Sequence, residues 1–247
     1  MTSDRRSVLI TGASGALGRA MCRAFAAEGF FIGVHYMSSE DEARAVLDEV
    51  QSLGAGGCLL DGDLTVADDA SRVLGRFLEA ASRIDVLVNN AGLSSDDLLF
   101  YMKREDWDRV LASNLDTLFE LTRLAVKAMI PQRSGRIINI SSASAFLGLP
   151  GQAHYAAAKA GVHGFTRALA RELGRFGICV NAIAPGAIES PSVSRLAEDK
   201  RRHLEEATCL NRLGKPDEVA AAAVFLASEK ATYITGQVIS VDGGITA

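Results

Sequence analysis

The sequence predicts an α/β fold in which a doubly wound, parallel, seven-stranded sheet carries helices on both faces. Seven short apolar runs alternate with longer amphipathic stretches, a pattern typical of parallel strands joined by helices. The 247 residues are enough to bury a substantial core, and no repeat or low-complexity linker divides them. We therefore expect one domain that spans residues 1–247.

The apolar runs predict the positions of the strands, and the periodic stretches between them predict the helices. Strands are expected at residues 7–11, 30–36, 57–63, 84–89, 136–140, 178–184 and 238–242. Helices are expected at residues 16–28, 39–53, 67–82, 107–129, 154–176 and 216–227. Pro216 suits the first turn of the last helix, because its missing N–H would have no partner there.

A polar, charged stretch at residues 187–212 contains no expected strand. This stretch fits a mobile insertion over the carboxyl ends of the strands, where parallel sheets bind their ligands. A surface loop without a function is the alternative interpretation.

Composition and charge exclude several classes of protein. A net charge of −4 argues against a nucleic-acid binder. No run reaches the ~18 apolar residues of a membrane span, and residues 1–6 lead into the first strand rather than into a signal peptide, so the cytoplasm is the expected compartment. The cysteines show no C-x-x-C spacing, which favours reduced structural thiols over zinc ligands or disulfides: Cys22, Cys58, Cys179 and Cys209.

Tyr155 and Lys159 are four residues apart in a run with few helix breakers, so both side chains should leave the same face of a helix. A nearby ammonium favours the phenolate, and we expect Lys159 to lower the pKa of Tyr155 from the free value near ~10. Such a pair can donate and accept a proton near neutral pH. An ordinary solvated helix face is the alternative for a Tyr-x-x-x-Lys pair on its own.

A glycine-rich turn follows the first apolar run. Gly12 suits a tight turn, and Gly18 allows close approach of helix and strand. Backbone N–H groups at the start of the next helix can hold a pyrophosphate. The order of strand, turn and helix predicts a nucleotide site, with a simple turn as the alternative.

Together with further motifs, these features resemble the short-chain dehydrogenase/reductase family. The resemblance runs from the first strand to the C-terminus, and Ser142 stands thirteen residues before Tyr155 as the family requires. Within the family the sequence is most similar to the 3-oxoacyl-(acyl-carrier-protein) reductases. One departure is that the family's middle glycine of the turn falls on Ala16, beside an additional glycine at Gly15. The motifs are residues 11–18 (TGASGALG), 89–92 (NNAG), 151–161 (GQAHYAAAKAG), 180–186 (VNAIAPG) and 233–236 (YITG).

The resemblance implies a Rossmann-type fold, a nicotinamide cofactor, a homotetramer and a substrate lid at residues 188–212. The implied catalytic side chains are Asn114, Ser142, Tyr155 and Lys159. The implied cofactor-binding residues are Gly12, Ser14, Gly15, Leu17, Gly18, Tyr36, Asp63, Leu64, Asn90, Ala91, Gly92, Tyr155, Lys159, Pro185, Gly186 and Ile188. For the Asn89 and Asn90 amides, a structural tie between neighbouring strands explains part of the motif equally well.

Reduction of a ketone needs a proton donor within hydrogen-bond reach of the carbonyl oxygen, and Tyr155 is the expected donor. Ser142 is expected to bind the same oxygen, and Lys159 to bind the nicotinamide ribose. By resemblance, Asn114 holds a water that leads protons towards Lys159, with a harmless buried amide as the alternative. Two competing hydroxyls have the wrong spacing to the tyrosine: Ser141 and Ser144.

The end of the second strand favours NADP(H) over NAD(H). Residues 34–39 contain no carboxylate, which would bind the ribose hydroxyls of NAD and repel a 2′-phosphate. This segment also contains no arginine or lysine, so the available phosphate partners are His35, Ser14, Ser38 and Ser39. A half-buried structural histidine is the alternative for His35.

The expected substrate is an acyl thioester on an acyl carrier protein, an acidic partner that needs a basic surface near the mouth of the site. Arg133 stands in the loop before the fifth strand, where the relatives carry a basic residue. A second basic position falls on Phe176, but Arg175 is adjacent and continues a helical stripe with Arg167 and Arg171. A displaced patch is one interpretation, and a solvated or subunit-bridging face is the other.

Ser95 and Asp97 weaken the carrier-protein interpretation, because the carrier-protein reductases usually have arginine and asparagine there. A dehydrogenase or reductase of small ketones, alcohols or sugars therefore remains open. A nucleotide-binding regulatory protein is the non-enzymatic alternative, and turnover of a ketone with NADPH would separate it from the enzymes.

Overall fold

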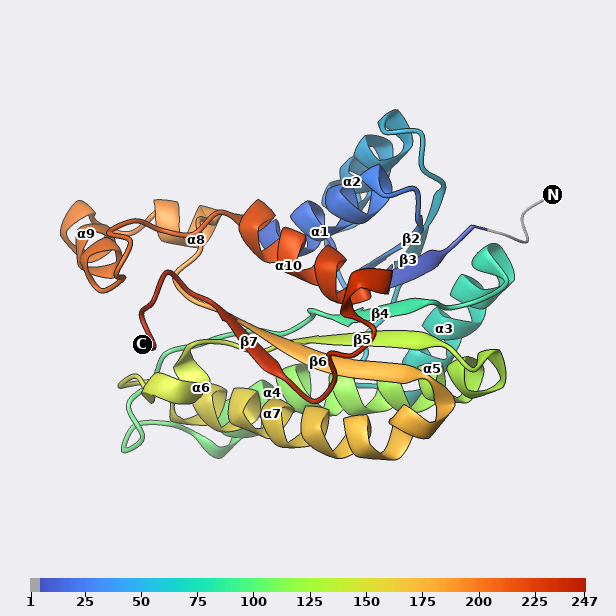
Figure 1. The fold of residues 1–247 in the computed structure, drawn as a ribbon. Coiled ribbons are helices and arrows are strands. Elements are labelled where there is room, and N and C mark those ends of the chain that lie inside the picture. The colour runs from blue at the N-terminus through green and yellow to red at the C-terminus, as the bar shows by residue number, and fades with distance from the viewer. Residues whose placement is uncertain (1–4) are drawn as a thin grey trace.

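The computed structural model describes residues 5–247. Within these residues the sheet contains seven strands: β1 (Ser7–Ile10), β2 (Phe31–Tyr36), β3 (Gly57–Asp61), β4 (Val86–Asn89), β5 (Gly135–Ile140), β6 (Ile178–Pro185) and β7 (Val238–Val241). They pair in parallel in the order β3-β2-β1-β4-β5-β6-β7, which confirms the predicted sheet (Figure 1). Strands β1 to β3 follow one another towards one edge of the sheet, and β4 to β7 follow one another towards the other edge. The switch point between β1 and β4 is where a crevice opens in such sheets.

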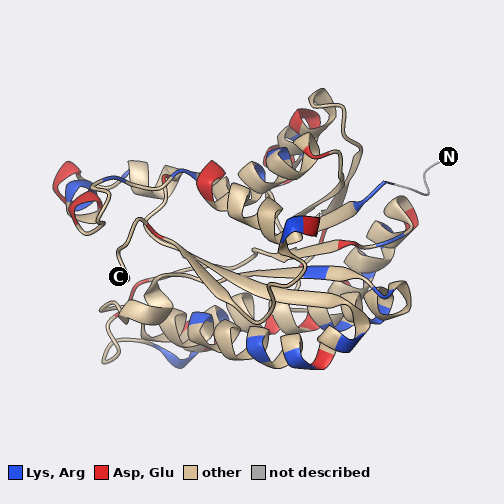
Figure 2. Cartoon of the chain, in the orientation of Figure 1, with Lys and Arg blue, Asp and Glu red and all other residues tan. Residues whose placement is uncertain are grey.

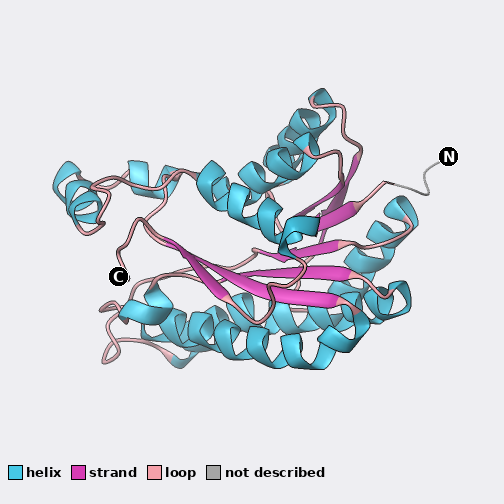
Figure 3. Ribbon diagram, viewed as in Figure 1, coloured by secondary structure: helices cyan, strands magenta, loops and turns pink. Residues whose placement is uncertain are grey.

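Long helices cover both faces of the sheet: α1 (Ala16–Ala27), α2 (Glu40–Ser52), α3 (Ala67–Ala81), α5 (Thr117–Gln132), α7 (Ala153–Leu173) and α10 (Pro216–Ala227). Helices α1, α2 and α10 pack on one face, and α3, α5 and α7 pack on the other (Figure 3). Short elements complete the chain: α4 (Arg104–Leu111), α6 (Ser144–Leu147), α8 (Pro191–Ser194), α9 (Glu198–Glu206) and the 3₁₀ turns η2 (Gly174–Phe176) and η3 (Glu229–Ala231).

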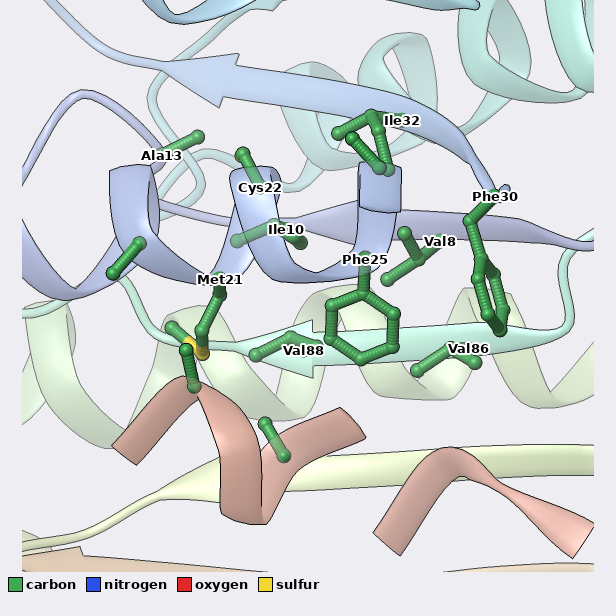
Figure 4. Close-up of a cluster of buried hydrophobic side chains, with 14 of the residues drawn as sticks. Val8, Ile10, Ala13, Met21, Cys22, Phe25, Phe30, Ile32, Val86 and Val88 are labelled. Carbon is green, nitrogen blue, oxygen red and sulfur yellow. The ribbon is translucent and has the colours of Figure 1, made fainter. Parts of the chain in front are cut away.

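The core follows from the alternation of side chains along each strand. Val8 and Ile10 of β1 point towards α1, while Leu9 between them joins the cluster on the opposite face. Met21 and Phe25 of α1 are fully buried over β1 and β4 (Figure 4). Complete burial of an aromatic side chain such as Phe25 stabilises the fold by roughly 1.5–3 kcal/mol.

The expected helix at residues 107–129 differs from the structure. The helical segment starts earlier, at α4, and a π-helical turn, η1 (Ala112–Asp116), separates α4 from α5. Inside this turn Asn114 donates from Nδ2 to the carbonyl oxygens of Val110 (2.9 Å) and Leu93 (2.7 Å). The bond to Leu93 ties the widened turn to the loop after β4, and such bulges are frequent at functional sites.

The insertion at residues 187–212 contains α8 and α9, which periodicity did not reveal because both helices are short and α9 has no buried side chain. The Ser190 hydroxyl accepts the N–H of Val193 at 3.3 Å and caps α8. An isolated bridge between Ile188 and Gly214 closes the base of the insertion. The two helices project from the side of the molecule where the C-terminus lies (Figure 1).

Two smaller differences concern the end of one helix and the presence of an additional one. The expected helix at 154–176 ends at Leu173 and continues as the 3₁₀ turn η2, and the short α6 was not expected. Among residues 5–247 no helix is long and apolar enough to cross a membrane.

Candidate active site

A cavity of about 460 Å³ opens at the carboxyl ends of β1, β4, β5 and β6. Its lining brings together ten residues selected from the sequence: Leu17, Asn90, Gly92, Asn114, Ser142, Tyr155, Lys159, Pro185, Gly186 and Ile188. The other selected residues lie outside this lining, along the glycine turn and the ends of β2, β3 and β4: Gly12, Ser14, Gly15, Gly18, Tyr36, Asp63, Leu64 and Ala91.

Tyr155 and Lys159 lie on the same face of the first turns of α7, as their spacing predicted. The Lys159 Nζ atom is 5.7 Å from the centroid of the Tyr155 ring. Lys159 is only 4% exposed, and its ammonium donates to the Ile140 carbonyl oxygen at 2.8 Å, at the end of β5. Burial lowers the pKa of Lys159 to about 8, because the charged form loses its hydration.

The charge of Lys159 was expected to lower the pKa of Tyr155, but burial has the larger effect on this pKa. Burial raises the pKa of Tyr155, and the Ser142 side chain opposes this by hydrogen bonding. The prediction of a lowered pKa was wrong because it counted the neighbouring charge and not the loss of hydration. Tyr155 is therefore held as a protonated phenol, the form that can donate a proton.

The three serines after β5 have separate contacts. Ser142 lines the cavity, and its hydroxyl accepts the N–H of Ser144 at 3.1 Å. The Ser141 hydroxyl donates to the Lys159 carbonyl oxygen at 3.1 Å and lies 2.7 Å from His163 Nε2. The Ser144 hydroxyl donates to Gln152 Oε1 at 2.8 Å. All three serines line the cavity, but the hydroxyl protons of Ser141 and Ser144 are donated to protein acceptors, whereas Ser142 only accepts in the hydrogen bond described above.

Asn114 is 2% exposed, and its Oδ1 atom has no hydrogen-bond partner among the residues that the structure describes. A Cβ atom on Gly92 would stand 2.3 Å from this oxygen and 3.5 Å from Lys159 Nζ. Only glycine allows the loop after β4 to pass so close. The oxygen thus lies near Lys159 without a partner among the described residues, and the proton path past Asn114 stays a prediction.

The glycine turn after β1 is shaped by two residues. Gly12 has φ +61°, and a Cβ on Gly18 would stand 2.3 Å from the Gly12 carbonyl oxygen. Gly15 has φ −74° and its nearest contact to an added Cβ is 3.5 Å, so this position does not require glycine. The additional glycine at Gly15 is therefore not required by the conformation of the turn, and Ala16 begins α1.

Asn90 makes the structural tie that the sequence left open. Its side-chain amide donates to the carbonyl oxygens of Thr11 (2.9 Å) and Gly12 (3.1 Å). The Thr11 hydroxyl accepts the N–H groups of Asn90 and Ala91 at 2.9 and 2.8 Å. These bonds fasten the end of β4 to the start of the glycine turn, and Asn89 similarly donates to Asn139 Oδ1 at 2.8 Å.

The end of β2 carries no carboxylate, and the acidic residues begin only with Glu40 at the start of α2. Tyr36 and Leu64 are buried, at 8% and 4% exposure. One carboxylate oxygen of Asp63 accepts the N–H and hydroxyl of Thr65 at 2.9 and 2.7 Å. His35 is 2% exposed and its ring nitrogens contact the backbone of Gly12 and Gly62, which favours the alternative of a structural histidine over a phosphate partner.

The arginines expected near the mouth of the cavity lie away from it. Arg133 and Arg175 flank one aromatic ring, with guanidinium carbons 5.9 and 4.7 Å from the Phe176 centroid. Arg175 follows α7, whose 21 residues begin beside the cavity. At 1.5 Å per residue that separation is roughly 30 Å. These arginines therefore follow α7 away from the cavity, with Arg167 and Arg171 within the helix, and a role as a docking patch stays a prediction. Basic residues recur along this helix (Figure 2).

The lining of the cavity also includes apolar side chains that were not selected individually from the sequence. They come from several segments: Leu147, Leu149, Val193, Leu204 and Ile245. Leu204 belongs to α9 and Ile245 to the C-terminal segment, so no local pattern brings these residues together. Within residues 5–247 the charged side chains of the lining are Lys159 and Glu189, and no arginine is among them.

The loop at residues 93–97 is braced against the segment before Tyr155. The Ser95 hydroxyl lies 3.2 Å from His154 Nε2, and Gln152 donates to Asp96 Oδ1 at 3.0 Å. The Asp97 N–H donates to the Gly151 carbonyl oxygen at 2.9 Å. The residues that depart from the carrier-protein reductase pattern thus take part in a local brace.

Comparisons with known proteins agree with this geometry. A family model described as "Enoyl-(Acyl carrier protein) reductase" matches residues 12–246. The chain is 41% identical to a 3-oxoacyl-[acyl-carrier-protein] reductase of Staphylococcus epidermidis (97% of this chain, 98% of that protein) and 44% identical to one of Synechocystis (96% and 95%). It is also 39% identical to nodulation protein G of Azospirillum brasilense (98% of each chain). Among solved structures, a putative gluconate dehydrogenase of Agrobacterium tumefaciens superposes with a TM-score of 0.94 at 33% identity (98% of this chain, 96% of that one).

Proposed function

This chain belongs to the short-chain dehydrogenase/reductase family, and we propose that it is an NADPH-dependent reductase that converts the 3-keto group of an acyl thioester to a 3-hydroxyl group. Enzymes of this family are oxidoreductases that use a nicotinamide cofactor. The observation that carries the finer proposal is that Ser142, Tyr155 and Lys159 line one cavity together with several apolar side chains. The relatives named as 3-oxoacyl-[acyl-carrier-protein] reductases support the same substrate.

The residues present fit a nicotinamide dinucleotide. The first turn of α1 has no side-chain cap, which leaves its backbone N–H groups available for a pyrophosphate. Gly92 passes close to Asn114 and Lys159, and the segment 185–188 borders the same cavity. When bound there, the nicotinamide supplies the hydride for the carbonyl carbon.

The protein's own groups supply the proton and hold the oxygen. Tyr155 donates its phenolic proton to the carbonyl oxygen, and the Ser142 hydroxyl donates a hydrogen bond to the same atom. The Lys159 ammonium stabilises the phenolate that forms on Tyr155. One of its N–H groups is bound to Ile140, which leaves two for the ribose hydroxyls and for proton return past Asn114.

The apolar side chains of the lining favour an acyl chain over a sugar acid. A carboxylate of a sugar acid usually requires an arginine or lysine partner, and the described lining offers only Lys159, which the chemistry uses. Leu147, Leu149 and Val193 instead suit the methylenes of an acyl chain, each worth about 0.8 kcal/mol when buried. A gluconate-type dehydrogenase is the second candidate because of the solved structure that superposes so well.

Parallel assays test the choice. NADPH oxidation should be fastest with a 3-oxoacyl thioester on an acyl carrier protein, slower with a free 3-oxo ester, and NADP⁺ reduction by gluconate should be negligible. Faster turnover of gluconate than of either ketone would reverse the assignment. The absence of turnover with all substrates, together with tight dinucleotide binding, would favour a regulatory protein.

NADPH is proposed because the end of β2 lacks a carboxylate that would repel the 2′-phosphate. Tyr36→Asp introduces this charge and should weaken NADPH more than NADH, by on the order of 1–3 kcal/mol in difference. Because the two cofactors share every other contact, the ratio of their dissociation constants cancels any damage to the fold. Equal losses, or a parent protein that prefers NADH, would contradict the cofactor assignment.

A homotetramer is the proposed assembly, by analogy with the family. The loop before α4 exposes several large apolar side chains, which supports contact with a second copy: Leu99 (69%), Phe100 (73%) and Tyr101 (71%). Sedimentation of the purified protein measures the assembly directly. A monomer at micromolar concentration would contradict this proposal and leave the proposed chemistry untouched.

A further inference from the structure

His35 is a buried polar side chain that the proposed mechanism does not use. Its Nδ1 atom lies 3.2 Å from the N–H of Gly12, and its Nε2 atom lies 3.1 Å from the carbonyl oxygen of Gly62. A backbone N–H can only donate, so Nδ1 must be the unprotonated acceptor. The proton then resides on Nε2, which donates to Gly62.

The imidazole links two segments expected to contact opposite parts of the dinucleotide. Gly12 opens the turn that receives the pyrophosphate, and Gly62 precedes Asp63 and Leu64 on the adenine side. The backbone repeats the connection, because the His35 carbonyl oxygen accepts the N–H of Ala13 at 2.8 Å and the Tyr36 carbonyl oxygen accepts that of Gly62 at 3.1 Å. His35 and Tyr36, at the end of β2, therefore contact both segments and hold them at a set distance from each other.

We propose that His35 is a positioning residue for the dinucleotide, whose neutral imidazole sets the distance between the glycine turn and the segment at 62–64. This inference rests on the proposed cofactor site. A protonated ring would place an N–H against the Gly12 N–H and break the contact that shapes the turn.

The surroundings of His35 keep the ring neutral. Burial lowers the pKa of His35 to about 4, although the Gly62 carbonyl oxygen and the charges of Asp61 and Asp63 act to raise it. Asp61 is itself paired with Arg72 and Arg76, which reduces its influence on the ring. The role therefore holds throughout the neutral pH range.

Three substitutions separate the two contacts. His35→Asn can keep an acceptor where Nδ1 lies but cannot reach Gly62, and His35→Gln can keep a donor where Nε2 lies but loses the acceptor for Gly12. His35→Leu removes both. The measurements are the dissociation constant of NADPH from the ketone-free protein, kcat at saturating NADPH, and the melting temperature without ligand.

We expect His35→Asn to bind NADPH within about 3-fold of the parent, and His35→Gln and His35→Leu to bind it about 10-fold more weakly or worse, because a buried donor on the turn loses its partner. Values of kcat at saturating NADPH should stay within about 2-fold. If His35→Leu does not fold, the comparison of the asparagine and glutamine variants still decides. Equal NADPH affinity in all soluble variants, or an equal loss in both amide variants, would contradict the proposal that the contact between His35 and Gly12 positions the turn for the dinucleotide. If the parent protein binds no dinucleotide, the proposed function fails instead.

Discussion

Tyr155 shows at the scale of one residue that burial and charge compete. Its spacing to Lys159 was readable from the sequence, but the direction of its pKa shift was not, because that depends on how much water the folded protein removes. A phenol with a raised pKa retains its proton near neutral pH. This suits a donor in the reductive direction.

Replacing Tyr155 by phenylalanine removes the phenolic proton and keeps the ring. We expect kcat to fall by at least ~10²-fold, while the NADPH dissociation constant changes by less than ~2-fold. Steady-state kinetics and direct binding measurements on the same preparation check both parts. Retention of most of kcat would transfer the donor role to another hydroxyl, with Ser142 the first to examine by Ser142→Ala.

The pKa of Lys159 predicts a pH dependence. Lysine is charged below its pKa, and the value of about 8 means that the ammonium beside Tyr155 is lost as the pH rises through that point. For the reductive direction kcat/KM should therefore be flat below pH 8 and fall above it, since this ratio reports the free enzyme. Lys159→Arg keeps the charge to much higher pH and should move the descending limb upward, even where its rate is lower. A parent profile that stays level to pH 9.5 would contradict the assignment.

At the scale of elements, the structure brings into contact segments that are far apart in the sequence. The π-helical turn η1 brings Asn114 beside Lys159, and the loop at 93–97 leans on the first turn of α7 through Ser95 and His154. Neither arrangement follows from periodicity, because both depend on hydrogen bonds between residues more than 20 positions apart. The helices and strands themselves were predictable, but the residues at which they end and the contacts between them were not.

Ser95→Ala removes the hydroxyl that meets His154 and frees the loop that forms one side of the cavity. A single hydrogen bond is worth about 1 kcal/mol net, so KM for the ketone should rise roughly 3- to 10-fold. Because the loop does not carry the proton, kcat should change much less, and NADPH affinity should stay constant. The exposed Ser52→Ala, on the last turn of α2, controls for loss of a serine hydroxyl far from the cavity. An unchanged KM would show that the other two contacts hold the loop without Ser95.

At the scale of the whole molecule, the position of the basic patch constrains any carrier protein. Arg133 and Arg175 share the Phe176 ring at the end of α7 away from the cavity. A carrier recognised by this patch is therefore expected to serve the cavity of another copy of the chain. The proposed tetramer gives that arrangement a physical basis.

Arg133→Glu tests the patch. We expect KM for the carrier-bound substrate to rise several-fold while kinetics on a free 3-oxo ester stay within ~2-fold, since the cavity is remote. Added salt should reduce the difference, because exposed charges are screened over roughly 8–10 Å at moderate ionic strength. Arg175→Glu should behave in the same way. Carrier-bound kinetics that are unchanged and insensitive to salt would place the docking surface elsewhere.

The sequence by itself determined the alternation of strands and helices, the glycine turn and the Tyr155–Lys159 face, because each depends on backbone rules that act within a few residues. Only the tertiary structure decided that the Gly12 N–H donates to His35, that Arg175 lies at the far end of α7, and that Leu147, Leu204 and Ile245 line one cavity. Those outcomes depend on how close segments far apart in the chain come to each other and on how much water they exclude from a side chain. A local sequence pattern determines neither of these.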